Sequence, residues 1–166
     1  MQQRPHIAPD YDKDFFAWTQ HQARVLRGLG KQSSAVPLDL DLAHVAEEIE
    51  DLGKAELRGA TSLIRNIMIH LIKAASEPSS EATGHWRSEA TTFHDDLPGY
   101  YAPSMRQRIN VQKLWARARK IAEVELQEHG ATMNPGIPTD CPFSLSEIVA
   151  GDFRFDAAVE RLRRRD

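Results

Sequence analysis

The sequence predicts an all-α protein, a helical bundle of about four main helices with a short helical C-terminal extension. Apolar residues recur at spacings of three, four and seven residues over long stretches, which is the period of a helix. Proline and glycine gather at a few positions between those stretches, where helices end. No segment alternates apolar and polar residues over the length of a strand.

Length and composition are typical of one cytoplasmic domain. The chain has 166 residues, 41% of them hydrophobic and 27% charged, so we expect a single helical domain over residues 1–166, with 1–9 flexible. Cys141 is the sole cysteine and forms no internal disulfide, which suits a reducing compartment. The N-terminus lacks the apolar core of a signal peptide, and no run reaches the ~18 apolar residues of a membrane span. A net charge of −3 gives no general attraction to nucleic acid.

The first helix is expected to begin at a cap formed by Asp10 or Asp12 and to reach about Leu29. Gly28 and Gly30 are its stop signals. One side of this helix, at 100° per residue, carries Phe15, Trp18, Gln22, Val25, Leu26 and Leu29. The aromatic residues of this stripe are predicted to belong to the core.

The second helix is expected to begin near Asp39 or Asp41 and to end before Pro78. Its apolar stripe consists of Leu42, Val45, Ile49, Leu52, Ala60, Leu63, Ile67 and Ala74. Gly53 and Gly59 each weaken a helix by about 1 kcal/mol relative to alanine, so the sequence leaves open whether the helix is continuous or is kinked or broken there. The half from Leu63 to Ala75 is apolar over most of its circumference and is predicted to be the centre of the core.

The rest of the chain is expected to add two further main helices and a terminal extension. A third helix is indicated by Trp86, Ala90, Phe93 and Leu97, and a fourth runs from Pro103 to about His129. Residues 131–166 are expected to form a loop plus short helices that pack on the bundle. The first of these begins with a capping box, Ser144-Leu145-Ser146-Glu147, and the last spans Asp156 to Arg165.

Two charged blocks complement each other. Residues 39–56 contain seven acids and one base, a net charge of −6, and residues 104–120 contain six bases and no acid, a net charge of +6. We therefore expect the two helices that carry them to lie side by side, with the charges setting their register. Each exposed pair contributes only ~0–1 kcal/mol. The acidic cluster is explained more readily by such pairing than by a catalytic site.

A second interpretation of the carboxylates is a polar cleft. Glu56 lies within the apolar stripe, where a charge needs a partner or a solvated cleft. His70 lies at the edge of the stripe, but in one continuous helix it is about 33 Å from Glu48. The two meet only if the helix turns back at residues 53–59 or another chain contributes. The candidate cleft consists of Glu48, Glu56, His70, Trp86 and Arg87.

No residue is assigned a catalytic or metal-binding role. His44, Glu47 and Asp51 share one side of the helix but point away from the apolar stripe. The phosphate-binding, dinucleotide-binding, zinc-protease and serine-hydrolase motifs are all absent from the sequence. Cys141 has no neighbouring base in the sequence and is interpreted as a half-buried apolar residue. We expect no cofactor.

Several segments in order resemble a known family. They are Tyr11-x-x-Asp14-Phe15-x-x-Trp18, Glu47-Glu48-Ile49-Glu50-Asp51-Leu52-Gly53-x-x-Glu56, His70-Leu71-Ile72-Lys73 with Pro78, Trp86-Arg87, and Cys141-Pro142-Phe143-Ser144-Leu145-x-x-Ile148. The series resembles the bacterial domain-of-unknown-function family 29 over about residues 11–153. The resemblance implies a compact all-α fold and no established activity, cofactor or catalytic residue.

The leading functional hypothesis is a small cytoplasmic protein that acts through protein–protein contact or regulation, with self-association as one form of that contact. An enzyme is less expected than a binding protein. One alternative is a metal- or small-ligand-binding enzyme that uses a buried cluster of Glu48, Glu56 and His70. A second alternative is a nucleic-acid-associated protein that uses the fourth helix and the basic C-terminal residues.

Overall fold

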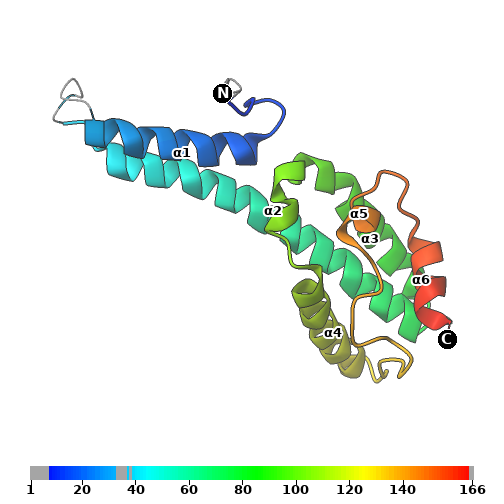
Figure 1. Cartoon of the computed structure of the whole chain (residues 1–166). Coiled ribbons are helices and arrows are strands. Elements are labelled where there is room, and N and C mark those ends of the chain that lie inside the picture. Colours follow the sequence, from blue (N-terminus) through cyan, green and yellow to red (C-terminus); the bar gives the residue numbers. More distant parts are fainter. Residues whose placement is uncertain (1–7, 33–36, 38, 165–166) are drawn as a thin grey trace. The chain divides into compact units, whose positions relative to one another are not determined.

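The computed structural model describes residues 8–32, 37 and 39–164, and this part of the chain is all-α, without a strand. Residues 1–7 of the segment predicted to be flexible lie outside it. The elements of the described part are α1 (Phe15–Gln32), α2 (Leu42–Ser76), α3 (Thr83–Asp96), η1 (Leu97–Gly99), η2 (Pro103–Gln107), α4 (Val111–Glu128), α5 (Leu145–Ile148) and α6 (Phe155–Arg163). The predicted fold class is confirmed, and the elements are labelled in Figure 1.

The residues group into two compact units, which we describe separately. The first contains the chain up to Arg58 together with Tyr101–Gln107, and the second contains Gly59–Tyr100 and the chain from Arg108 onward. The boundary at residues 58–59 falls inside α2, which is one uninterrupted helix. The helix therefore runs unbroken through Gly53 and Gly59. That the chain forms a single domain stays a prediction.

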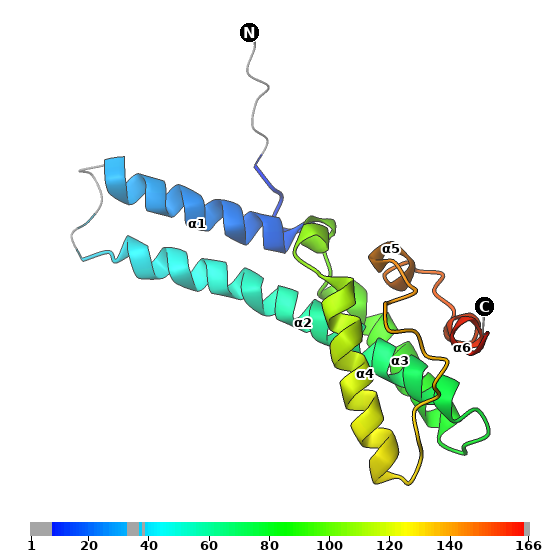
Figure 2. The ribbon, with the colours of Figure 1, turned by 60° about the horizontal axis from the view of Figure 1, so that its bottom comes forward.

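The first unit is a helical hairpin in which α1 runs antiparallel beside the N-terminal half of α2 (Figures 1 and 2). Its seam consists of small or buried side chains: Phe16, Thr19 and Ala23 of α1, and Ala46 of α2, are at most 6% exposed. A Cβ atom at Gly53 would overlap the Thr19 hydroxyl. Gly53 therefore allows the two helices to approach closely, a packing reason for a glycine inside a helix.

Both predicted ends of α1 need correction. The helix begins at Phe15, and the cap is Asp14, whose Oδ1 accepts a hydrogen bond from the Ala17 amide at 2.8 Å. Asp10 instead organises the preceding turn, where it accepts from the Asp12 amide. At the other end α1 continues through Gly28 and Gly30 to Gln32, because helix contacts outweigh the ~1 kcal/mol cost of each glycine.

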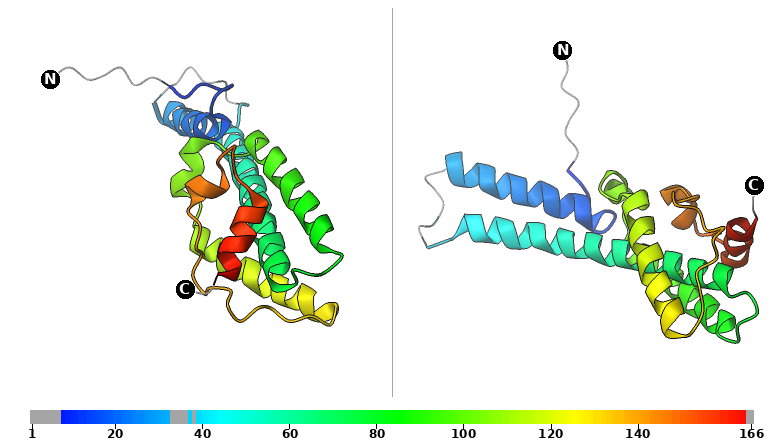
Figure 3. Two further views of the ribbon diagram at one scale, coloured as in Figure 1. Left: turned by 90° about the vertical axis from the view of Figure 1, so that its right-hand side faces the viewer. Right: turned by 90° about the horizontal axis from the view of Figure 1, so that it is seen from below.

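In the second unit the C-terminal half of α2 is the centre of the core, as predicted. Its fully buried side chains are Ala60, Ile64, Ile67, Met68, Leu71, Ile72 and Ala74. Helices α3, α4 and α6 lie around it (Figure 3). On α6, Arg163 Nη2 donates to the carbonyl of Ala74 at 2.9 Å. A helix enclosed in this way is apolar over most of its circumference, which explains its broad apolar arc.

The fourth helix is shorter than predicted. Pro103 begins the 3-10 helix η2, and α4 begins at Val111 after Asn110, whose side chain accepts from the Lys113 amide at 2.9 Å. Gly130 follows the end of α4 with φ of +72°, the left-handed conformation that stops a helix. The capping box at Ser144 and Glu147 is confirmed, and it opens the short helix α5.

Candidate functional site

The five residues of the predicted cleft are divided between the two units. Glu48 is exposed and Glu56 is half-buried, both on the part of α2 that belongs to the first unit. His70 is buried in the second unit, where Trp86 and Arg87 lie on α3. Since α2 does not turn back, the condition for joining Glu48 to His70 within one chain is not met. Any site within one copy of the chain that uses these residues therefore lies in one unit or the other.

His70 lies in a polar cluster of the second unit. Its Nε2 is 3.4 Å from Glu89 Oε2 of α3, and His85 Nε2 lies 3.3 Å from the same oxygen. The His70 ring stacks on Phe93 with ring centroids 5.7 Å apart. Burial lowers the pKa of His70 below its ordinary value, against the opposing effect of the Glu89 carboxylate. The imidazole is thus kept neutral near neutral pH.

Lys73, one turn further along α2, makes a second polar contact between helices. Its Nζ is 2.6 Å from Glu125 Oε2 of α4 and 4.9 Å from the centroid of the Trp86 ring. A buried ammonium held by a carboxylate and an aromatic face is satisfied electrostatically. Arg87 points elsewhere and pairs with Asp156 of α6 at 2.8 Å on the surface. Of the predicted cleft residues, the structure brings only His70 and Trp86 into one cluster.

Sequence reasoning missed Glu89, which closes this cluster. The pair His85 and Glu89 is visible at i and i+4, and His70 was expected to need a carboxylate, but contact between two helices cannot be read from spacing. Across the described part of the chain, no group of three or more His, Cys, Asp or Glu side chains is placed to hold a metal ion. The cluster connects α2 to α3 through the contact of His70 with Glu89, and α2 to α4 through the Lys73–Glu125 ion pair.

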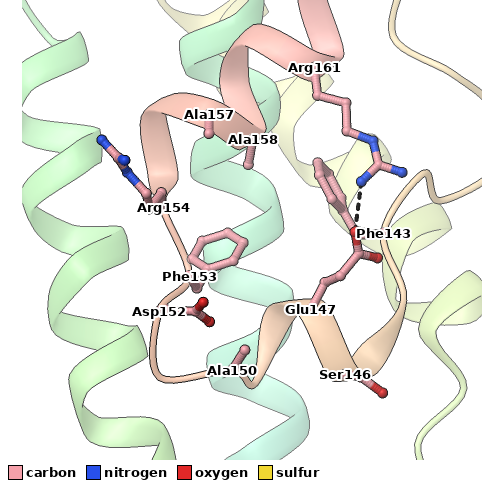
Figure 4. A pocket seen from close by; sticks show the side chains of 10 residues that line it. All are labelled: Phe143, Ser146, Glu147, Ala150, Asp152, Phe153, Arg154, Ala157, Ala158 and Arg161. Carbon is pink, nitrogen blue, oxygen red and sulfur yellow. Dashed lines mark hydrogen bonds and ion pairs between the residues drawn. The ribbon is translucent and has the colours of Figure 1, made fainter.

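A hollow of about 520 Å³ lies between α5 and α6 (Figure 4). The rings of Phe143 and Phe153 and three alanines, Ala150, Ala157 and Ala158, line it. At its rim Glu147 Oε1 accepts from Arg161 at 2.8 Å. The Ser144 backbone and side chain, together with Arg161, lower the pKa of Glu147 to about 2. These charges satisfy each other, so the hollow offers mainly apolar contact.

Cys141 lies near this hollow but has no sign of reactivity. Its thiol donates to the carbonyl of Phe143 at 3.4 Å. Burial raises the pKa of the Cys141 thiol, which lowers the fraction of thiolate at neutral pH. With 9% exposure Cys141 is more deeply buried than the half-buried apolar residue expected from the sequence.

The hairpin of the first unit presents a surface of another kind. Four large aliphatic side chains are exposed on it: Val25 by 49%, Leu29 by 45%, Val45 by 38% and Leu52 by 54%. They come from both helices, at a spacing of four residues on α1 and seven on α2. Each spacing keeps its pair on one side of its helix. The question is whether the two pairs share one face of the hairpin.

The ion pair between Arg27 and Glu50 shows that the two aliphatic pairs share one face of the hairpin. Arg27 of α1 and Glu50 of α2 meet at 2.5 Å, so both point to the same face of the hairpin. Since successive helical residues are about 100° apart, Val25 and Leu29 lie about 160° from Arg27 around α1. Leu52 lies about 160° and Val45 about 140° from Glu50 around α2. All four aliphatic residues therefore lie on the face opposite the ion pair.

We call this surface the open face and define it by eight residues at spacings of three and four. They are Trp18, Gln22, Val25 and Leu29 of α1, with Val45, Glu48, Leu52 and Glu56 of α2. At one end the Trp18 ring makes an edge contact with Tyr11, with centroids 4.8 Å apart, and stacks on Phe15. The α1 stripe predicted from the sequence is this surface, but it is half-exposed and does not form the seam of the hairpin.

The charge blocks do not pair as expected within the first unit. Glu50 of the acidic block takes its basic partner from α1, through Arg27, and Lys54 of the same block pairs with Asp51 at 2.8 Å. Apart from Arg106, the bases of residues 104–120 belong to the second unit. Glu56 makes no ion pair with another described residue, so the buried salt bridge considered for it is not found there.

These features define an all-α protein that has a helical hairpin with an open apolar face and an enclosed core helix. The chain matches the family model described as domain of unknown function DUF29 over residues 11–154, and it belongs to that family. The resemblance noted from the sequence is therefore confirmed.

The chain is also similar to a solved structure, an alpha-helical protein of unknown function from Rhodospirillum rubrum. The two are 40% identical with a TM-score of 0.90, and the match covers 93% of this chain and 98% of the other. No curated protein matches the chain. Within the described residues, no helix combines the length and apolar character that crossing a membrane requires.

Proposed function

We propose that the protein is a protein-interaction module and that the open face is its contact surface. The observation that supports this is the gathering of four half-exposed aliphatic side chains on one side of the hairpin. Single exposed apolar residues are ordinary on monomeric proteins, whereas contiguous groups mark interaction surfaces. The opposite face of the same hairpin carries the Arg27–Glu50 ion pair, which suits exposure to water.

Covering this surface would contribute favourable apolar burial to binding. Fully burying one large aliphatic side chain contributes about 1.5–3 kcal/mol. About half of each of the four is exposed, so covering them contributes on the order of 3–6 kcal/mol before the cost of association. Trp18 and the neighbouring aromatic rings extend the contact at one end, and aromatic anchors often dominate interfaces.

The two other hypotheses have less support. The enzyme hypothesis required Glu48, Glu56 and His70 to converge, and the continuous α2 does not allow this within one chain. The nucleic-acid hypothesis relied partly on the C-terminal bases. Two of these are paired with acids, Arg161 with Glu147 and Arg163 with Glu160.

Site-specific photocrosslinking tests the proposal. A photoreactive amino acid replaces Leu52 on the open face, or Val124 on α4 as the control, which is exposed to almost the same degree (54% and 55%). In living cells, the probe at position 52 is expected to form adducts with protein chains, and the probe at position 124 is not. Equal labelling at both positions, or none at position 52, would show that the open face is not a contact surface.

A further inference from the structure

We infer that the partner of the open face is a second copy of this chain, related by a two-fold axis, with α1 of each copy lying along α2 of the other. This inference rests on the proposed function and names the partner. A layer of two helices buries only one side of each helix. Two such layers packed face to face give a four-helix arrangement in which all four stripes are covered.

The polar groups of the open face are divided between its two helices. The carboxylates are both on α2, where Glu48 and Glu56 each lie four residues from Leu52. On α1 the stripe has no charge, and its polar groups are the amide of Gln22 and the indole N–H of Trp18. The face therefore carries acceptors on one helix and hydrogen-bond donors on the other.

That division selects one arrangement of two copies. Packing α2 on the partner's α2 would bring carboxylates against carboxylates, and like charges in contact are destabilising. Packing α1 on the partner's α2 places the donors opposite the carboxylates, and the two-fold axis repeats this match on the other side. A polar pair within an apolar interface commonly sets its register.

The dimensions of the two stripes also match. The stripe on α1 runs from Trp18 to Leu29 and that on α2 from Val45 to Glu56, eleven residue steps in each case. Each is therefore about 16 Å long, and two helices side by side are about 20 Å wide. Equal lengths let each stripe cover the other completely. The two stripes together outline a patch of roughly 320 Å² per copy, which could form only the centre of an interface of ordinary size, about 800 Å² per partner.

Sedimentation velocity over a concentration series tests whether the second copy is the occupant. Leu52→Asp and Val25→Asp are each expected to weaken self-association by about tenfold or more, because each brings an unpaired charge into an apolar interface. The control Val124→Asp is expected to change it by less than about twofold. Circular dichroism verifies that every variant keeps its helix content. Equal weakening by the control and the two variants would place the interface elsewhere.

Disulfide crosslinking tests the orientation. Gln22→Cys and Glu48→Cys are made as two separate proteins, each with Cys141→Ala, then mixed and oxidised. In the proposed arrangement position 22 of one copy is level with position 48 of the other, so the expected product is the heterodimer that joins them. Predominant 22–22 or 48–48 homodimers would overturn the α1-on-α2 arrangement.

The outcomes separate this inference from the function on which it rests. A strict monomer in sedimentation, with photocrosslinks from position 52 to other proteins, would show that the partner is a different chain and leave the interaction function standing. A monomer without position-specific crosslinks would overturn both. A concentration-dependent dimer that Leu52→Asp abolishes and Val124→Asp retains supports both.

Discussion

The Thr19 hydroxyl occupies the space in which a side chain at Gly53 would begin. Thr19 is completely buried, and its Oγ1 donates to the carbonyl of Phe16 at 2.8 Å, which holds the side chain in place. The distance between α1 and α2 is thus set by the smallest residue of one helix and a fixed hydroxyl of the other. This contact determines which sides of the helices face each other.

Gly53→Ala is therefore expected to destabilise the hairpin, although alanine is the better helix former by about 1 kcal/mol. The added methyl group has to displace Thr19 or separate the helices, and overpacking of this kind costs about 1–3 kcal/mol. Urea unfolding followed by circular dichroism, together with hydrogen exchange of α1 amides, measures the effect.

The matched control for this prediction is Gly28→Ala. Gly28 also lies inside a helix, but a Cβ there meets no atom within 4 Å. This substitution is expected to raise the free energy of unfolding by up to about 1 kcal/mol. If Gly53→Ala stabilised the protein as much as Gly28→Ala, the close approach of Thr19 would have no energetic consequence.

The Lys73–Glu125 pair predicts an asymmetry between its two partners. Lys73 has 10% of its side chain exposed, and Glu125 has 38%. Glu125→Gln leaves a buried ammonium without its counter-charge and is expected to cost about 1–3 kcal/mol. Lys73→Met leaves a carboxylate that water can reach and is expected to cost less than about 1 kcal/mol. Chemical denaturation of both variants and the double variant gives the comparison, and equal costs would contradict it.

The stability of the second unit is expected to fall on mild acidification. The folded-state pKa of His70 is lowered from the ordinary 6.5 mainly by burial, so the unfolded chain binds more protons below about that pH. The free energy of unfolding therefore decreases as pH falls from 6.5 to the folded-state pKa of His70. His85, Glu89, Lys73 and Glu125 also act on His70, so the comparison is between the native protein and His70→Gln.

His70→Gln is expected to reduce the slope of stability against pH between about pH 8 and pH 5, since glutamine does not titrate. Urea denaturation at several pH values measures this slope. His44→Gln serves as a comparison of opposite sign, because Asp41 raises the pKa of that exposed histidine, so its removal is expected to increase the slope. An unchanged slope in His70→Gln would show that its protonation is not linked to folding.

Glu147 is expected to titrate at about pH 2 in the native protein. Arg161→Met removes the ion pair and should raise the pKa of Glu147, yet keep it below the ordinary 4.5 because the Ser144 backbone N–H still donates to the carboxylate. An NMR titration of the Glu147 carboxyl group measures both values. A pKa at 4.5 in the variant would mean that the capping box does not persist without Arg161.

The helical period predicted which segments form helices, but not which side of α1 is buried. The stripe of large residues on α1 looked like the core side, while the seam is made by Phe16, Thr19 and Ala23 opposite Gly53. Hydrophobicity favours large side chains in the core, whereas the close packing of two helices needs small side chains between them. The sequence alone does not show which of these two requirements determines the buried side of α1. The enclosed half of α2 was predicted correctly, because a helix that is apolar over most of its circumference has to be surrounded by other helices.

The candidate site was predictable only in part. Glu48 and Glu56 were singled out, and both lie on the open face, but as polar members of an apolar surface. His70 needed a carboxylate from another helix, and Glu89 supplies it from α3. Contacts between helices depend on how each helix is rotated about its own axis relative to its neighbours. The periodicity of a single segment carries no information on that rotation. The start of α1 was placed at Asp10 or Asp12, but Asp14 caps it, and its end was placed at glycines through which the helix continues. The start of α4 was placed at Pro103, but Asn110 caps it.

The continuity of α2 limits how this protein can be divided into fragments that fold on their own. Compact units are usually joined by a loop, where a chain can be cut without damage. Here the cut would fall between residues 58 and 59 inside a helix of 35 residues. A fragment ending there would expose four backbone carbonyls that are now hydrogen-bonded, and the remainder would begin with four unpaired amides. Truncation at the boundary is therefore expected to yield two frayed fragments, and gene dissection to require overlapping pieces that each keep the whole of α2.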